Sequence, residues 1–234
     1  MNYYDKNIIE IHNDLINKNV TSKELIDFSK SKILETNEKY NAYNLVLDSV
    51  ENNEINTLLS GIPYAMKDNI STKGIRTTAC SNTLKDYVPI YNATVYEKLC
   101  KNGAIMIGKT NMDELAMGGT GLTGNAGIVK NPYDEERISA GSSAGSAVAV
   151  ATKTVPFAIG TDTGDSIRKP AAYTGVVGYK PSYGLISRYG LFAFASSLDT
   201  IGVITNSVID AATVVNTVKG SDDKDMTTIK DMDE

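Results

Sequence analysis

Apolar side chains recur every three or four positions over the first forty residues, which is the period of an amphipathic helix. Ile8, Ile11 and Leu15 share one stripe. Further along, Thr21 and Glu24 have the spacing of a capping box, which marks the start of a helix. We therefore predict two amphipathic helices that pack outside a core formed by later residues.

From Gly61 onward the chain alternates between two kinds of segment. GIPYAMKD at 61–68 and GAIMIGKT at 103–110 are short apolar runs flanked by glycine and charge, as buried strands are. ATVYEKLCKN at 93–102 has a helical period, and VPFAIGTDTG at 155–164 predicts a further strand that ends in a glycine turn. This alternation predicts the α/β class.

Changes in composition divide the chain into three parts. Residues 1–60 form an N-terminal helical segment that ends in a polar connection, and residues 61–220 form the core. The polar residues 221–234 are expected to be a solvated tail. Within the core, residues 118–147 are rich in Gly, Ser, Thr and Asn, and we expect a loop there that carries function.

Charge and cysteine content exclude several classes of protein. The chain has 23 Lys and Arg against 28 Asp and Glu, so a net charge of −5 disfavours binding of nucleic acid by its own surface. Cys80 and Cys100 have no CxxC spacing, and with one histidine they cannot form a usual zinc site. We expect a reducing, cytosolic compartment, no standard export signal and no membrane span.

Two possible sites can be set aside. His12 is the only imidazole, and its helical surroundings predict a surface residue, so a Ser-His-Asp or Cys-His centre is not expected. Gly119, Gly121 and Gly124 match the dinucleotide fingerprint GxGxxG. A helical segment precedes this match and a poor helix follows it, so the strand and helix that such a site requires are missing.

Two segments that contain serine are stronger candidates for chemistry. AGSSAGSAVAVAT at 140–152 could be only the start of a tightly packed helix. GTDTGDSIRKPAA at 160–172 places Ser166 after a glycine turn, where main-chain N–H groups can face a developing oxyanion. The base available is Lys67, whose pKa would be lowered by burial, although it could equally be an ordinary lysine at a strand end.

These segments, with GIPYAMKDNISTKGIRTTACSNTL at 61–84 and GAIMIGKTNMDELAMG at 103–118, resemble the amidase signature family over nearly the whole chain from residue 7. SRYGLFAFASSLDTIGVIT at 187–205 and KGSDDKDMTT at 219–228 are most similar to the A subunits of glutamyl-tRNA(Gln) amidotransferases. The resemblance implies a mixed β-sheet flanked by helices, the amidase signature fold. We expect that fold to be incomplete, since the chain has roughly half the family's length.

The resemblance also implies a site. In it Lys67, Ser142 and Ser166 form a Ser-cis-Ser-Lys triad, with neutral Lys67 as the base, Ser142 as the relay and Ser166 as the nucleophile. Ser142 is expected to lie between the other two within hydrogen-bond reach, with heavy atoms roughly 2.6–3.2 Å apart, and further apart when no ligand is bound. The oxyanion hole would be formed by the main-chain N–H groups of Thr163, Gly164, Asp165 and Ser166.

The function implied is hydrolysis of glutamine to supply ammonia for converting Glu-tRNA(Gln) to Gln-tRNA(Gln). The partners implied are a B subunit, which uses ATP and Mg²⁺ and holds the tRNA, and a C subunit, in the cytoplasm or an organellar matrix. No cofactor or metal is expected on this chain. Two alternatives stay open: a stand-alone amidase acting on another carboxamide, and a non-catalytic remnant that only binds partner subunits.

Three departures from the family pattern surround the implied site. TDTGDS has Asp165 where the family has glycine, AGSSAG has Ala140 and Ala144 in place of glycines, and GLTGN at 121–125 replaces an acidic TENSA loop. We expect the Asp165 carboxylate to oppose the oxyanion, and its Cβ to strain the backbone. The alternative is that Asp165 points to solvent and has no effect on the oxyanion. We also expect one edge or face of the sheet to be exposed where the rest of the family domain would pack.

Overall fold

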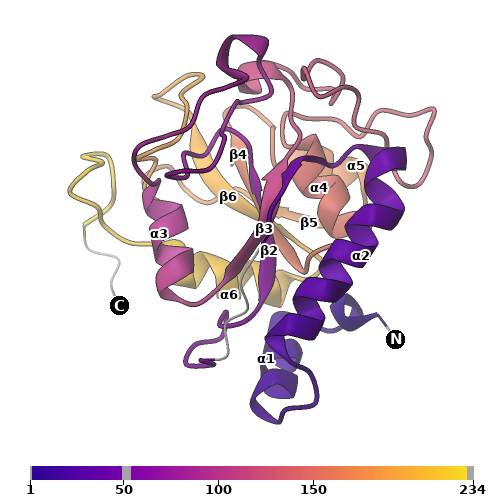
Figure 1. The fold of residues 1–234 in the computed structure, drawn as a ribbon. Helices are drawn as coiled ribbons and strands as arrows, with labels where there is room; N and C mark the ends of the chain where they lie inside the picture. The colour runs from indigo at the N-terminus through magenta and orange to yellow at the C-terminus, as the bar shows by residue number, and fades with distance from the viewer. Residues whose placement is uncertain (1, 49–53, 231–234) are drawn as a thin grey trace.

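The computed structural model describes residues 2–48 and 54–230, which form a six-stranded mixed sheet between two layers of helices (Figure 1). The strand order is β1-β3-β2-β4-β6-β5, with β2, β3 and β4 parallel and the other pairings antiparallel. The predicted fold class is therefore confirmed. The strands are β1 (Tyr43–Val46), β2 (Pro63–Lys67), β3 (Ile105–Thr110), β4 (Phe157–Asp162), β5 (Val177–Tyr179) and β6 (Thr200–Thr205).

Helices cover both faces of the sheet. On one face lie α2 (Ser22–Tyr40), α4 (Ala144–Ala151) and α5 (Arg168–Tyr173), and on the other lie α1 (Ile8–Ile16), α3 (Thr94–Lys101) and α6 (Val208–Val218). The predicted capping box of Thr21 and Glu24 is formed at the start of α2. Within the described residues, no helix is long and apolar enough to cross a membrane. Three single turns of 3₁₀ helix complete the elements: η1 (Tyr3–Asp5), η2 (Asn82–Leu84) and η3 (Glu114–Ala116).

The alternation of side chains along β2 separates two apolar cores. Tyr64 and Met66 point into the core beneath α1, α3 and α6, and Ala65 points into the core beneath α2 and α4. Ile8 and Leu25 are fully buried members of the first core. The N-terminal helices therefore form part of the core itself, because their apolar stripes lie against the sheet.

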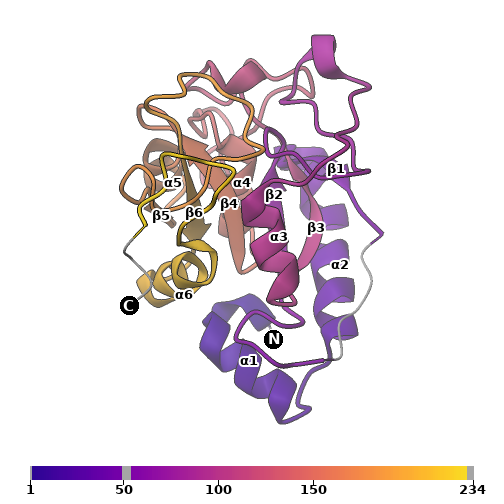
Figure 2. The same cartoon turned by 90° about the vertical axis from the view of Figure 1, so that its left-hand side faces the viewer.

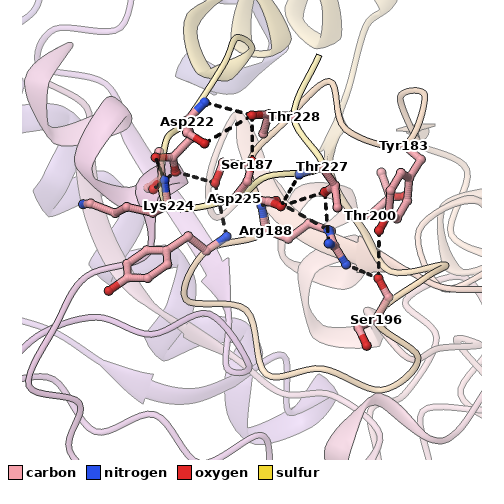
Figure 3. A network of polar contacts seen from close by, with 12 residues as sticks. Tyr183, Ser187, Arg188, Ser196, Thr200, Asp222, Lys224, Asp225, Thr227 and Thr228 are labelled. Atoms are coloured by element: carbon pink, nitrogen blue, oxygen red, sulfur yellow. Dashed lines mark hydrogen bonds and ion pairs between the residues drawn. The ribbon is translucent and has the colours of Figure 1, made fainter. Parts of the chain in front are cut away.

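The structure differs from the predicted three-part division of the chain in two places. β1 lies within the N-terminal sixty residues, yet it pairs with β3 and belongs to the central sheet. The segment 221–230 is not simply solvated: Asp222 accepts a hydrogen bond from Ser187 Oγ at 2.6 Å, and Asp225 accepts one from the Arg188 N–H at 2.8 Å (Figure 3). Asp222 and Asp225 therefore hold this segment against the core. Residues 231–234 of the predicted tail lie outside the described part.

The long loops gather at one end of the sheet (Figures 1 and 2). β2, β3 and β4 run parallel and end there at Lys67, Thr110 and Asp162. In open sheets with parallel strands, ligands bind beyond the carboxyl ends of the strands. The fold thus brings the segments with candidate chemistry together at the end of the sheet where the parallel strands finish.

Candidate active site

Lys67 closes β2 and is fully buried on the α4 side of the sheet. Its Nζ donates to Ser142 Oγ at 2.7 Å and to Thr161 Oγ1 at 2.8 Å. Thr161 Oγ1 also accepts from Asn69 Nδ2 at 3.1 Å, so the end of β4 fixes the position of the amine. Strand pairing and helix placement together bring two residues 75 positions apart into direct contact.

Burial dominates the electrostatics of this amine. Loss of water lowers the pKa of Lys67 from 10.5 to about 7, since the charged form is poorly solvated in the protein interior. The buried carboxylates Asp113, Asp162 and Asp199 act in the opposite direction but more weakly. Lys67 is thereby suited to accept a proton near neutral pH.

Ser142 lies just before the first turn of α4, and the peptide bond between Gly141 and Ser142 is cis. A Cβ at Gly141 would lie 2.0 Å from Asp113 Oδ2, so no side chain fits at this position. The main-chain N–H of Asp113 in turn donates to the carbonyl oxygen of Ser142 at 3.3 Å. Close backbone approach thus fixes the position of Ser142.

The glycine-rich loop at 119–124 binds a carboxylate of the chain itself. Asp113 is fully buried, and its oxygens accept N–H groups from Gly121, Leu122 and Thr123 at 3.0–3.1 Å. The motif that matches a dinucleotide fingerprint is therefore a nest of N–H donors around Asp113. Its role is to hold the loop beside Gly141.

Ser166 lies between β4 and α5 and is nearly buried, with 7% of its surface exposed. Its carbonyl oxygen accepts the Ser143 N–H at 3.1 Å, which ties the start of α4 to this loop. Over residues 2–48 and 54–230, no hydrogen bond joins the hydroxyls of Ser142 and Ser166. The expected contact between Lys67 and Ser142 is present, and the expected hydrogen bond from Ser142 to Ser166 is not formed.

Asp162 fixes the loop from Thr163 to Ser166 through hydrogen bonds with the residues that follow it. This buried carboxylate accepts the Ile167 N–H at 2.9 Å and two guanidinium N–H groups of Arg168 at 3.1 and 3.2 Å. In the described part of the chain, none of the four main-chain N–H groups of 163–166 donates to a protein acceptor. They are available to a ligand.

Asp165 corrects part of the expectation from sequence. Its carboxylate is half exposed and forms an ion pair with Lys169 at 3.4 Å, so a nearby cation offsets its charge. Asp165 is not among the described residues with positive φ, so the predicted strain at this position is wrong. The left-handed conformation falls instead on Ala140, with φ of 60°.

Sequence reasoning missed the residues that position the site. Thr161, Asp162 and Asp113 lie inside the recognised motifs GTDTGDS and KTNMDELAMG, but their contacts depend on distant segments.

Cys80 is buried and donates to Asn111 Oδ1 at 3.3 Å, and burial raises the pKa of its thiol to about 12. His12 is half-buried on α1, at the end of the sheet away from the loops (Figure 1).

A family model described as Amidase matches residues 19–234. The chain belongs to the amidase family. It is 44% identical to the A subunit of the Lactiplantibacillus plantarum glutamyl-tRNA(Gln) amidotransferase over 98% of this chain and 49% of the relative. It is 51% identical to the corresponding A subunit of Thermoanaerobacter pseudethanolicus over 87% of this chain and 40% of the relative. This amidase chain thus spans about half the length of the curated relatives it matches.

Solved structures of two amidase-family proteins share its fold. The A subunit of the Thermotoga maritima glutamyl-tRNA(Gln) amidotransferase gives a TM-score of 0.91 at 42% identity, over 98% of this chain and 50% of that chain. The peptide amidase of Stenotrophomonas maltophilia gives 0.88 at 32% identity, over 97% and 50%. Among the described residues, no group of three or more His, Cys, Asp or Glu side chains could hold a metal ion.

Proposed function

We propose that this amidase chain carries the glutaminase centre of a glutamyl-tRNA(Gln) amidotransferase A subunit. The observation that supports it best is the 2.7 Å contact of the buried Lys67 amine with Ser142, beside the loop that holds Ser166. Relatives that are 44–51% identical have this subunit's name. A lysine with a pKa of about 7 supplies the base that a serine nucleophile requires in a site without histidine.

The proposed reaction transfers the acyl group of glutamine through Ser166. In this proposal the bound substrate brings the hydroxyls of Ser142 and Ser166, which share no hydrogen bond in the described chain, within hydrogen-bond distance. Ser166 Oγ then bonds to the side-chain carboxamide carbon while its proton passes to Ser142 Oγ, and the Ser142 proton passes to neutral Lys67 Nζ. The relay then returns a proton to the leaving nitrogen, the C–N bond breaks and ammonia departs. Water attacks the acyl-Ser166 ester by the same proton path, releasing glutamate and restoring the serine.

The N–H groups of residues 163–166 would stabilise the negative oxygen of each tetrahedral intermediate. They have no protein acceptor in the described part of the chain, and the ion pair of Asp162 with Arg168 holds the loop that presents them. Each such donor is typically worth about 10²–10³ in rate. The carboxylate of Asp165 lowers this benefit only partly, because Lys169 lies beside it.

We propose that ammonia passes to a B subunit, which uses ATP and Mg²⁺ to convert Glu-tRNA(Gln) to Gln-tRNA(Gln), within a complex that also holds a C subunit. The net charge of −5 fits a chain that leaves the tRNA to its partner. The location proposed is the cytoplasm or an organellar matrix. The similarity to a peptide amidase supports a second candidate, a stand-alone amidase on another carboxamide.

Ammonia release separates these candidates. The purified chain is assayed with glutamine and with a peptide amide, each with and without a B subunit. The proposal predicts that the chain releases ammonia from glutamine. Ser142→Ala should lower this rate by at least about 100-fold. Ser146→Ala is the matched control, because Ser146 is equally buried on α4 but bonds Thr110 and Ile159. Equal losses in both variants, or turnover of the peptide amide alone, would contradict the proposal.

A further inference from the structure

The 192–199 loop leads into β6 and is tied to the candidate site at both ends. At one end, the main-chain N–H of Phe192 donates to the carbonyl oxygen of Asn69, just beyond β2, at 2.9 Å. At the other end, Thr163 Oγ1 donates to Asp199 Oδ1 at 2.5 Å. The loop therefore links the strand that carries the candidate base to the first residue after β4.

The middle of the 192–199 loop is also fixed by hydrogen bonds. The carbonyl oxygen of Ser196 accepts the Tyr183 hydroxyl at 3.0 Å and a guanidinium N–H of Arg188 (Figure 3). The side chains of the loop are largely outside the core, and Phe194 is 45% exposed. Polar contacts, more than apolar packing, therefore set the position of this loop.

Asp199 is the buried residue of the 192–199 loop, with 3% of its surface exposed. Its carboxylate accepts the main-chain N–H groups of Phe194 at 2.9 Å and Ala195 at 3.1 Å, which shape the local turn. The third bond comes from Thr163, 36 positions earlier in the chain. A buried carboxylate requires donors around it, and the turn alone supplies only two of these three.

The loop of 163–166 has little packing of its own. A Cβ at Gly164 would meet no atom within 4 Å, so open space surrounds the middle of this loop. Polar contacts hold its two ends: Asp162 fixes the residues that follow it, and the bond from Thr163 to Asp199 fixes its start. The direction of the free N–H groups depends on both contacts.

We infer that Asp199 is a positioning residue that orients, through Thr163, the N–H groups of residues 163–166 toward the oxyanion. In the described chain its carboxylate bonds to neither Lys67 nor Ser166, so it acts through the loop. Hydrogen bonds to an ionised acceptor are roughly twice as strong as neutral ones, so one such bond can hold a loop that packing leaves free. The inference rests on the proposed function, which assigns the oxyanion hole.

The charge of Asp199 has a second effect, which must be separated from its bond to Thr163. Asp199 raises the pKa of Lys67 against the effect of burial. Three other groups act on this amine in the same direction: Asp113, Asp162 and Cys80. Since the reaction needs neutral Lys67, Asp199→Asn should move the rise of rate with pH to lower pH. Thr163→Val keeps the charge and the shape of the side chain, so this rise should stay in place.

Glutamine turnover at pH 9 tests the bond alone, because Lys67, with a pKa of about 7, is neutral there in every variant. We expect Asp199→Asn and Thr163→Val each to lower kcat at least about ten-fold and to change KM less than about two-fold, because the oxyanion forms only after attack. The double variant should lose at most about two-fold more than either single variant, since both remove one bond. Thr163→Ser retains the hydroxyl and should recover at least about half of the natural kcat.

Asp210→Asn is the matched control. Asp210 is 2% exposed and accepts the Ile8 N–H at 2.7 Å, beyond the opposite end of β6. The variant thus changes an equally buried carboxylate away from the site, and kcat should stay within about two-fold of the natural value. An unchanged kcat in Thr163→Val, or an equal loss in Asp210→Asn, would overturn the inference.

Hydrogen exchange of the segment 160–172, followed by mass spectrometry, gives a readout that does not need turnover. Exchange there should be at least about three-fold faster in Asp199→Asn and Thr163→Val, and unchanged in Asp210→Asn, because only the first two release the loop. Unchanged exchange in the first two variants would contradict the positioning role. A natural chain that releases no ammonia from glutamine, with exchange faster in those two variants, would overturn the proposed function alone.

Discussion

Replacing Lys67 with methionine tests the burial of the amine through stability instead of activity. Methionine keeps the length of the side chain but cannot take up a proton. The pKa of Lys67 is about 7 in the folded chain and returns to 10.5 on unfolding. Between these two values the unfolded state holds about one proton more than the folded state, so the free energy of unfolding rises with pH in this window.

The expected slope is about 1.4 kcal/mol for each pH unit. Between pH 7.5 and 9.0, the natural chain should therefore gain about 2 kcal/mol of stability relative to Lys67→Met. Ser142 and Thr161 lose a donor in the variant, but that penalty does not depend on pH over this range. The pKa of the buried Lys109 is also lowered, to about 8, and its contribution cancels because both proteins contain it.

Urea unfolding followed by circular dichroism, repeated at half-unit pH steps, measures this difference. The m-value of each curve must agree between the two proteins, so that only stability is compared. If the free energies of unfolding of the two proteins change in parallel from pH 7.5 to 9.0, the reasoning is refuted. Parallel curves would mean that Lys67 takes up no proton on unfolding in this pH range.

The other predictions concern activity and backbone strain. Ser166→Ala should abolish amide hydrolysis in an ammonia assay, whereas Cys80→Ala and His12→Ala should leave it unchanged; a loss in the Cys80 variant would indicate another nucleophile. Asp165→Gly should raise kcat by only about two- to three-fold, because an ion pair already offsets the carboxylate, and an unchanged kcat would show that the carboxylate has no effect on the oxyanion. Ala140→Gly should raise the free energy of unfolding by about 0.5–1 kcal/mol, since it relieves a positive φ, and a lower melting temperature would contradict this.

Local signals in the sequence were enough for much of the fold. The apolar stripe of α1, the capping box of α2 and the apolar runs of β2, β3 and β4 lie where the pattern predicts them. These elements could be predicted because each is specified by neighbouring residues with a fixed period. The family resemblance, carried by contiguous motifs, likewise gave the mixed sheet.

Tertiary structure decided what depends on distant neighbours. The short strand β5 has no period of its own, and its place at the edge follows from pairing with β6. Lys67 could be an ordinary strand-end lysine by sequence, and only packing against Ser142 and Thr161 removes it from water. The left-handed conformation of Ala140 likewise has no periodic signal in the sequence. The sequence names the groups, whereas desolvation, pairing and backbone angle depend on residues far apart along the chain, so the fold determines them.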